Sequence, residues 1–333
     1  MKANTENNDV ALVSCMRNEG LFVLEWLAYH SLLGFKKIVV FTNDCTDGSD
    51  TLLDRLQERQ YLTHIRHSVP NGRSVQKRAM AKALCHEDVK QCEWLLHIDS
   101  DEYLNVSAGQ GTVHDLISAV GEADLIAIAW KWFGCSGNEF WSGGSTMCKL
   151  VRGQASPQWR LRGHKSLFRQ RKFGRASDHM PKNPTGSSVL VKSTNGTVLD
   201  DRPIYEASGS KFSLARGDLT FENATINHYA FRSIDTHLMK NDRGDGMGFR
   251  SEKYYYRSKF WNKFNVVEAL DHSILRWWPE VQNRLSEFLA DPETRRLNDA
   301  CLAAYIERRD KVLTPEQIAA WTASPDESED TTP

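Results

Sequence analysis

The first 130 residues alternate between two hydrophobic patterns. Short, almost continuous apolar runs such as VALVSCM (10–16), KIVVFTND (37–44) and EWLLHID (93–99) are typical of strands that are buried on both faces. Between them, apolar residues recur every three or four positions, as in EGLFVLEWLAYHSLLG (19–34), and this spacing predicts helices. Strands that alternate with helices in this way predict an α/β fold with a mostly parallel sheet flanked by helices.

The same patterns predict further elements: strands over 61–67 and 124–133, and helices over 47–60, 74–89 and 112–123. Residues 134–225 are rich in Gly, Ser, Arg and Lys, which predicts irregular loops with a few short strands. We therefore divide the chain into a sheet domain (1–232), a C-terminal helical region (233–321) and a disordered acidic tail (322–333).

Composition narrows the classes of function. The formal net charge of -1 gives no global attraction to nucleic acid, and no nucleic-acid-binding module is recognised. The seven cysteines form no C-x-x-C pair, and the N-terminus is polar, so we expect a cytoplasmic protein. No apolar run approaches the roughly 20 residues that a transmembrane helix needs.

Polar loops rich in carboxylates follow three of the predicted strands, at 16–19, 43–50 and 99–102. In a parallel sheet these loops meet at one edge, where ligands bind. Crowded carboxylates repel one another unless a divalent cation, which prefers oxygen ligands, lies between them. Each loop also has a plainer explanation, because Asn, Asp, Gly and Ser are favoured in turns and acidic residues at helix starts.

The residues also carry a resemblance to a known family. The order SCMRNEG, EWLAYHSLLGFKKIVVFTNDCTDGSDTLL and WLLHIDSDEYL resembles nucleotide-sugar glycosyltransferases of family 2, in a branch related to family 92. Further segments extend it over roughly residues 10–275: FGCSG (133–137), KSLFR (165–169), INHYAFRS (226–233) and YYYRSKFWNKFN (254–265). The resemblance implies a glycosyltransferase A fold, Rossmann-like, with a C-terminal helical extension.

The resemblance also implies a donor site for a nucleotide sugar, most simply a UDP-sugar, with Mn²⁺ or Mg²⁺. Asp99 and Asp101 resemble the family's Asp-x-Asp pair, and His228 resembles a histidine that returns to the metal or diphosphate. The residues implied for donor binding are Arg17, Asn18, Glu19, Asn43, Asp44, Asp47, Gln76, Asp99 and Ser100. Without the resemblance, His228 would be taken as a core or surface histidine, and for Gln76 an exposed helix residue is an interpretation as open as a place near the donor.

Two further segments have open interpretations. Lys240 and Arg243 either neutralise a bound diphosphate or are charges at a helix C-terminus that ends at Gly244. The basic and aromatic segment 253–264 could stack sugars or make peripheral contact with a membrane, but an amphipathic helix packed on the sheet domain is favoured.

The candidates for the catalytic base are Glu139, Asp178 and His179, since an inverting enzyme needs such a group near the acceptor hydroxyl. The sequence thus predicts a metal-dependent glycosyltransferase that acts on a glycan, polysaccharide or lipid-linked acceptor. Two alternatives stay open: a sugar nucleotidyltransferase, and a non-catalytic protein of the same fold that binds nucleotides or glycans. The first would normally carry a Gly-rich basic phosphate loop, where this chain has MRNEG.

Overall fold

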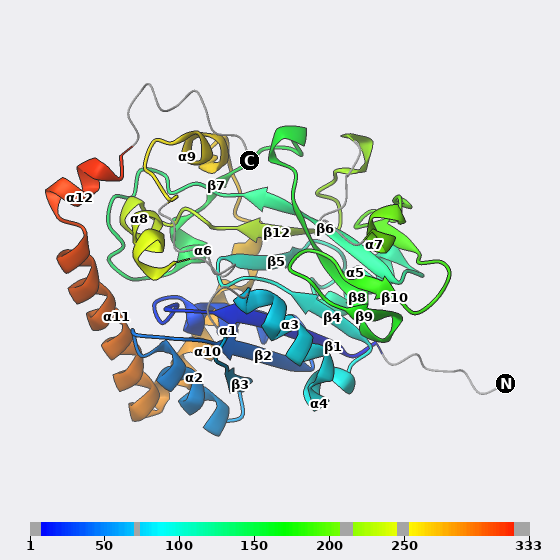
Figure 1. The fold of residues 1–333 in the computed structure, drawn as a ribbon, viewed down its shortest axis with the longest axis horizontal. Helices are drawn as coiled ribbons and strands as arrows, with labels where there is room; N and C mark the ends of the chain where they lie inside the picture. Colours follow the sequence, from blue (N-terminus) through cyan, green and yellow to red (C-terminus); the bar gives the residue numbers. More distant parts are fainter. Residues whose placement is uncertain (1–7, 70–73, 207–215, 245–252, 323–333) are drawn as a thin grey trace.

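A twisted sheet lies at the centre of the molecule, with helices on both of its faces (Figure 1). The computed structural model describes residues 8–69, 74–206, 216–244 and 253–322. Most of the predicted acidic tail lies outside the described residues. Among the described helices, none is long and apolar enough to cross a membrane.

Nine strands of the described chain form the main sheet, in the order β3-β2-β1-β4-β8-β6-β12-β5, with β11 paired to the start of β6. Their bounds are β1 Val10–Met16, β2 Lys37–Thr42, β3 Thr63–Arg66, β4 Trp94–His97, β5 Glu102–Val106, β6 Leu125–Trp132, β8 His164–Arg169, β11 Val191–Ser193 and β12 Ala224–His228. The pairings of β8 with β4 and β6, and of β12 with β5, are antiparallel, and the other pairings in this sheet are parallel. The predicted α/β class with a mostly parallel sheet is confirmed.

The helices of the described chain are α1 Val23–His30, α2 Ser49–Glu58, α3 Val75–Cys85, α4 Glu87–Lys90, α5 Val113–Val120, α6 Thr146–Lys149, α7 Arg202–Tyr205, α8 Ile234–Arg243, α9 Lys259–Phe264, α10 Trp278–Ala290, α11 Pro292–Val312 and α12 Pro315–Ala320. Short turns of 3-10 helix cover Trp159–Leu161, Gln170–Lys172, Arg216–Asp218 and Ser273–Trp277. Two small ribbons pair β9 Phe173–Arg175 with β10 Lys182–Pro184, and β7 Arg152–Gly153 with β13 Ala269–Leu270.

The central strands are apolar throughout because both of their faces are covered. In β1, Val10 and Leu12 pack into a cluster with α1, α2, α5 and α10, whereas Ala11 and Val13 pack into a second cluster with α3 and α4. All four side chains are fully buried. This explains why the strand shows no alternation of polar and apolar residues.

Side chains of α1 form hydrogen bonds with the backbone of the edge strand β5. The hydrophobic pattern of the sequence did not predict this contact. Trp26 donates its indole N–H to the Glu102 carbonyl at 3.0 Å, and Tyr29 donates its hydroxyl to the Leu104 carbonyl at 2.7 Å. The Leu104 N–H donates in turn to His30 Nε2 at 3.3 Å. The spacing of these three residues along α1 places them on one face, so a helix satisfies the backbone groups that an edge strand would otherwise expose.

The C-terminal helices pack against the N-terminal part of the chain. Helix α11 lies along α2 and α8 at one side of the molecule (Figure 1). Asp291 accepts two hydrogen bonds from the Arg55 guanidinium, at 2.7 and 2.9 Å, and caps α11 through the Thr294 N–H. Gly20 meets α11 so closely that a Cβ there would lie 2.6 Å from the Cys301 side chain.

The segment 253–264 contains the short helix α9, which packs against the sheet domain as favoured above. Trp261 is buried in a cluster with Trp132, Phe231 and Val266. Phe260 remains 42% exposed, so this helix also presents an aromatic side chain to solvent.

Acidification should destabilise the fold through His30. This buried imidazole donates Nδ1–H to the Trp26 carbonyl at 2.8 Å and accepts the Leu104 N–H, and burial lowers its pKa to about 3. An unfolded histidine has a pKa of about 6.5, so between these values only the unfolded state binds the proton. The free energy of unfolding should therefore fall by about 1.4 kcal/mol per pH unit on this account. Urea unfolding between pH 6 and 4, inside this interval, measures the slope. The variant His30→Leu should show a slope smaller by one proton, and equal slopes would contradict the assignment.

A single methyl group added to the loop after β1, where it packs on α11, should lower the free energy of unfolding. The variant Gly20→Ala should lose about 1–3 kcal/mol of unfolding free energy, because the Cys301 side chain lies too close to be accommodated. Gly217 is a matched control, because a Cβ there meets nothing within 4 Å. Equal urea midpoints for the two variants would show that the loop and helix do not pack in this way.

Candidate functional site

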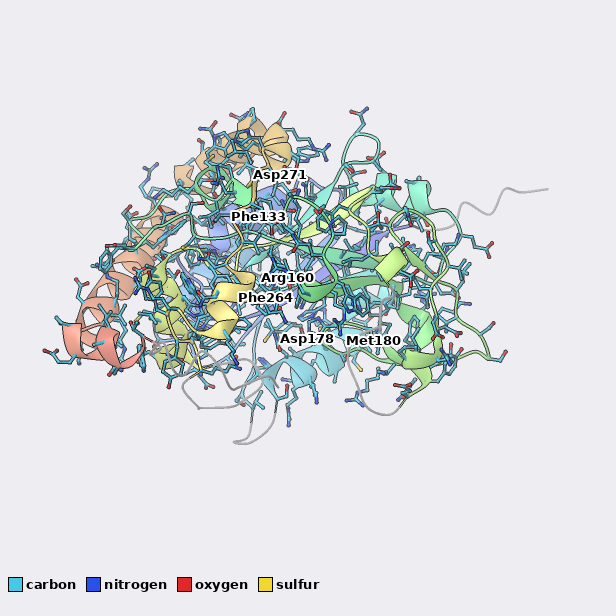
Figure 2. The ribbon with its side chains drawn as sticks, turned by 90° about the horizontal axis from the view of Figure 1, so that it is seen from above. Phe133, Arg160, Asp178, Met180, Phe264 and Asp271 are labelled. Atoms are coloured by element: carbon cyan, nitrogen blue, oxygen red, sulfur yellow. The ribbon has the colours of Figure 1, made fainter. Side chains whose placement is uncertain are left out.

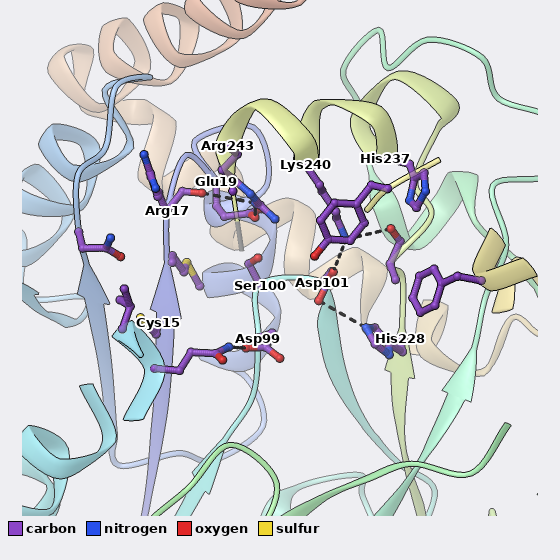
Figure 3. Close-up of a pocket in the computed structure, with 18 of the residues that line it drawn as sticks. Cys15, Arg17, Glu19, Asp99, Ser100, Asp101, His228, His237, Lys240 and Arg243 are labelled. Atoms are coloured by element: carbon purple, nitrogen blue, oxygen red, sulfur yellow. Dashed lines mark hydrogen bonds and ion pairs between the residues drawn. The ribbon is translucent and has the colours of Figure 1, made fainter. Parts of the chain in front are cut away.

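A cavity of about 250 Å³ opens where β1, β4 and β12 end and where α8 crosses above them (Figure 3). This is the sheet edge at which the sequence predicted a ligand site. Ten of the residues singled out from the sequence line it: Arg17, Glu19, Asn43, Gln76, Asp99, Ser100, Asp101, His228, Lys240 and Arg243. Elements from distant parts of the chain therefore bring most of the predicted donor residues together.

Asp101 is a half-buried carboxylate between two basic side chains. Lys240 donates to its Oδ2 at 3.1 Å, and His228 Nε2 lies 3.6 Å from its Oδ1. Burial opposes ionisation, but Lys240 and His228 outweigh it and hold the pKa of Asp101 well below its usual value. The backbone is fixed as well, because Tyr229 donates its N–H to the Asp101 carbonyl at 2.7 Å. Asp101 is thus ionised at neutral pH and aimed at the cavity (Figure 3).

His228 lies at the end of β12 and packs against two tryptophan rings. Its ring centre is 4.3 Å from that of Trp132 and 4.7 Å from that of Trp130. Burial among these rings lowers the pKa of His228, although Asp101 partly offsets the shift. A neutral imidazole beside an ionised carboxylate provides the protonation states that metal ligands require.

Asp99 points in a different direction from Asp101. Its Oδ1 accepts a hydrogen bond from Gln76 Nε2 at 2.9 Å, and its Oδ2 accepts one from Lys165 Nζ at 2.9 Å. Gln76 is therefore not a free surface residue, since it reaches from α3 to the turn between β4 and β5. The two aspartates of the pair thus enter different sets of contacts.

Lys165 is a fully buried lysine that sequence reasoning assigned no role. It projects from β8, and its Nζ lies 2.9 Å from Asp99, 3.0 Å from Asp178 and 3.4 Å from Glu102. These carboxylates raise the pKa of Lys165 well above its usual value despite the opposing effect of burial. Lys165 therefore carries its charge inside the protein, and the signal that could have found it is a lysine within the apolar strand sequence HKSLFR.

The described residues offer two places where a metal could be considered. In the first, ligand atoms of His97, Asp99 and Asp178 lie within 4.8 Å of one another. That cluster does not fit a metal, because the Lys165 ammonium already lies against both carboxylates. His97 is also engaged, since its Nδ1 donates to the Asp178 carbonyl at 3.2 Å.

The second place, Asp101 and His228, fits a metal through Asp101 Oδ1, because the Lys240 ammonium lies against the other oxygen, Oδ2. Two atoms that bind one ion at about 2.1 Å each lie between about 3.0 and 4.2 Å apart, depending on the angle at the metal. The 3.6 Å between His228 Nε2 and Asp101 Oδ1 falls within that range. The sequence predicted Asp99, Asp101 and His228 as ligands. The geometry favours Asp101 and His228, whereas Asp99 is held by Gln76 and Lys165.

The loop after β1 is held by ion pairs with the C-terminal part of the chain. The buried Glu19 accepts a hydrogen bond from Arg243, and the Arg232 guanidinium lies 3.7 Å from its other oxygen. Arg232 also donates to the Ser100 carbonyl at 2.7 Å, so it joins this loop to the turn that carries the aspartates. Arg232 was not singled out as a site residue, although it lies within the INHYAFRS segment. Arg17 Nε has no hydrogen-bond partner among the described residues and lines the cavity.

Three of the predicted donor residues mainly hold the loops together. Asn18 and Thr46 exchange hydrogen bonds at 2.8 and 3.0 Å, and Asp47 accepts the backbone N–H groups of Gly20 and Ser49. Asn18 and Asp47 line an adjoining cavity of about 450 Å³, which shares Arg17, Glu19, Ala230, Lys240 and Arg243 with the first. Asp44 lines neither cavity and accepts a hydrogen bond from Asn43 at 3.1 Å.

The three candidates for the catalytic base lie in two different places. Asp178 lies between β9 and β10, near Met180 (Figure 2), with its Oδ2 3.0 Å from His179 Nε2. Both are connected to the cavity through Lys165 and Asp99 rather than lining it. Glu139 is exposed and lies outside both cavities, and its carbonyl accepts the Asp235 N–H at the start of α8.

Among solved structures, the chain is similar in part to TarS 1–349 of S. aureus, with a TM-score of 0.33 and 17% identity over 49% of this chain and 47% of that one. It is also similar to glucosyl-3-phosphoglycerate synthase of Mycobacterium tuberculosis with Mg²⁺ and UDP, with a TM-score of 0.28 and 16% identity over 37% and 44% of the two chains.

Curated relatives and a family model place the chain more firmly. It is 25% identical over 133 residues to a glycosyltransferase family 92 protein of Ricinus communis, covering 39% of this chain and 24% of the relative. It is 27% identical over 110 residues to one of Oryza sativa subsp. japonica, covering 33% of this chain and 18% of the relative. The match thus spans about a quarter or less of the length of these relatives. The model of glycosyltransferase family 92 matches residues 12–240, more than half of the sequence, and the chain therefore belongs to that family.

Proposed function

We propose that this protein is a metal-dependent glycosyltransferase that moves a sugar from a nucleotide sugar, most simply a UDP-sugar, to an acceptor hydroxyl. The acceptor would be a glycan, a polysaccharide or a lipid-linked saccharide. One observation carries the proposal: an ionised Asp101 and a neutral His228 lie 3.6 Å apart at a cavity rimmed by cationic side chains. The glycosyltransferase A fold, the relation to family 2 and a cytoplasmic location are parts of the same proposal.

The residues that would hold Mn²⁺ or Mg²⁺ are Asp101 and His228. When bound, the ion would neutralise negative charge that develops on the nucleoside diphosphate leaving group. Lys240 adds a fixed cation, because its ammonium lies 3.1 Å from Asp101 Oδ2 and 3.1 Å from the Ala230 carbonyl. A diphosphate in the cavity would thus meet Lys240 without any rearrangement of the backbone.

Other cavity residues would bind and orient the nucleotide. The Arg17 guanidinium, which lines the cavity, would donate hydrogen bonds to a phosphate oxygen. Asp99 would accept a hydrogen bond from a ribose or sugar hydroxyl, because Gln76 and Lys165 fix its carboxylate in one orientation. Orientation of this kind lowers the entropic cost of reaching the transition state.

Asp178 and His179 are the remaining candidates for the base. His179 Nδ1 donates to the His164 carbonyl at 3.1 Å, so its Nε2 must also carry or share a proton to approach the Asp178 carboxylate at 3.0 Å. The pair would therefore have to release that proton before accepting one from an acceptor hydroxyl. Glu139 is a weaker candidate, since its exposed side chain lines neither cavity.

The alternatives differ in what they require of the loop after β1. A nucleotidyltransferase needs a glycine-rich loop with basic side chains to bind a triphosphate. This loop instead carries Glu19, which is buried against Arg243 and Arg232. A binding protein without activity would keep nucleotide affinity but release no free nucleotide.

A screen of nucleoside diphosphates and UDP-sugars tests the proposed function. The full chain should show a higher melting temperature with UDP or a UDP-sugar and Mn²⁺ together than with either alone, because ligands that bind the folded state stabilise it. Slow release of UDP from the matching UDP-sugar, measured with a coupled assay, would separate an enzyme from a binding protein. Stabilisation by nucleoside triphosphates alone, with pyrophosphate release, would favour the nucleotidyltransferase instead.

The variant Asp101→Asn should lose metal-dependent nucleotide binding. The amide keeps the shape of the side chain but removes the charge that a divalent cation needs, so UDP affinity in the presence of Mn²⁺ should fall by more than about 100-fold. Isothermal titration calorimetry measures the loss. Asp299→Asn, on the exposed side of α11, is the control and should bind as the unaltered chain does. Unchanged affinity in Asp101→Asn would rule out the proposed metal site.

A further inference from the structure

Lys165 places a positive charge where solvent does not reach. Its side chain has no exposed surface, and it projects from β8 between the antiparallel neighbours β4 and β6. An ammonium in such a place is tolerated only if carboxylates pair with it closely. Asp99 and Asp178 do so at 2.9 and 3.0 Å, whereas Glu102, at 3.4 Å, is so deeply buried that its pKa is raised well above the usual value.

Lys165 and its acidic neighbours connect the donor cavity with the segment between β9 and β10. Asp99 turns its other oxygen toward Gln76 on α3, at the donor cavity. Asp178 turns its other oxygen toward His179, in the segment between β9 and β10. The side chains of Asp99 and Asp178 are 27% and 23% exposed, so each reaches solvent on the side away from Lys165.

Glu102 holds the backbone of the turn that carries Asp99. Its Oε2 accepts the Asp99 backbone N–H at 2.9 Å, and the side chain is completely buried. It therefore holds the turn between β4 and β5 in the conformation that brings Asp99 to Lys165.

We propose that Lys165 is a positioning residue whose ammonium takes the place of a divalent cation in the His97–Asp99–Asp178 cluster, and so confines the metal to Asp101 and His228. The inference rests on the proposed function, since it concerns the metal of the same site. Without Lys165, two carboxylates and an imidazole within 4.8 Å of one another would form a second cation site. With Lys165 in place, Asp99 is a hydrogen-bond acceptor for the donor and not a metal ligand.

Charge and distance both support this assignment. A lysine and a divalent cation cannot share the same two carboxylate oxygens, because like charges at such a separation repel strongly in a buried setting. Nζ lies within hydrogen-bond distance of both Asp99 Oδ2 and Asp178 Oδ1. Of the two places considered among the described residues, the one formed by Asp101 and His228 keeps a carboxylate oxygen, Oδ1, away from any ammonium, and both residues line the cavity.

The first test counts metal ions on the full chain. Electron paramagnetic resonance of Mn²⁺, in the presence of UDP, should show one bound ion per unaltered chain. Asp101→Asn should lose it, whereas Asp178→Asn should bind Mn²⁺ within about twofold of the unaltered affinity, because Asp178 is not a ligand. Mn²⁺ that stays bound in Asp101→Asn, or is lost in Asp178→Asn, would overturn the inference.

The second test removes the ammonium. Lys165→Met keeps the length of the side chain but not its charge, and it should gain a second Mn²⁺ per chain while the Asp101 ion is retained. A purely structural lysine would give no such gain. If Lys165→Met does not fold, Lys165→Gln, which also removes the charge, takes its place, and a single bound Mn²⁺ per chain in that variant would overturn the inference.

The two proposals fail in different ways. If the unaltered chain binds neither Mn²⁺ nor UDP, the proposed function is wrong. If it binds one Mn²⁺ that depends on Asp178, or two ions at once, the proposed function stands and the role of Lys165 is wrong.

Discussion

The charge of Lys165 is the constraint on which the site depends. A buried ammonium must be matched by carboxylates at hydrogen-bond distance, and here the matching groups come from two segments of the chain other than β8, the strand that carries Lys165. The middle of the sheet, the turn between β4 and β5 and the segment before β10 are therefore fixed relative to one another. Asp99 owes its orientation to that match, and Asp101 follows it in the same turn, facing the other way toward His228.

A second set of contacts holds the turn from the other side. Strand β5 begins at Glu102, directly after the turn, and it pairs with β12 along one edge while α1 caps the other. The register of β5 and β12 places Glu102 opposite His228. The distance between the proposed metal ligands is thus set by a strand pairing, which is far stiffer than a loop.

The sequence predicted the elements whose side chains are uniformly apolar, and it failed where polar residues are buried. β1, β2, β4 and β6 were recognised because both faces of each are covered. β5 and β12 were not, because their polar residues find partners only in the folded chain: Asn105 donates to Ser273, and Thr225 to Asn227. His228 was found through resemblance to a family, since no local pattern connects it with Asp101. Lys165 was missed because the three carboxylates that justify a buried lysine cannot be inferred from the strand that carries it.

The order of the strands has a consequence for how the protein is made. β12 lies between β5 and β6, although both of those strands are synthesised about a hundred residues earlier. While the chain emerges from the ribosome, β5 and β6 cannot close against each other in the native arrangement, because the strand that joins them does not yet exist. His228 arrives on that late strand, so the two halves of the metal pair meet only when the sheet closes. A chain released before β12 is made would contain the acidic turn before β5 but would lack His228 and so the proposed metal site. The unpaired edges of β5 and β6 would then be targets for chaperones.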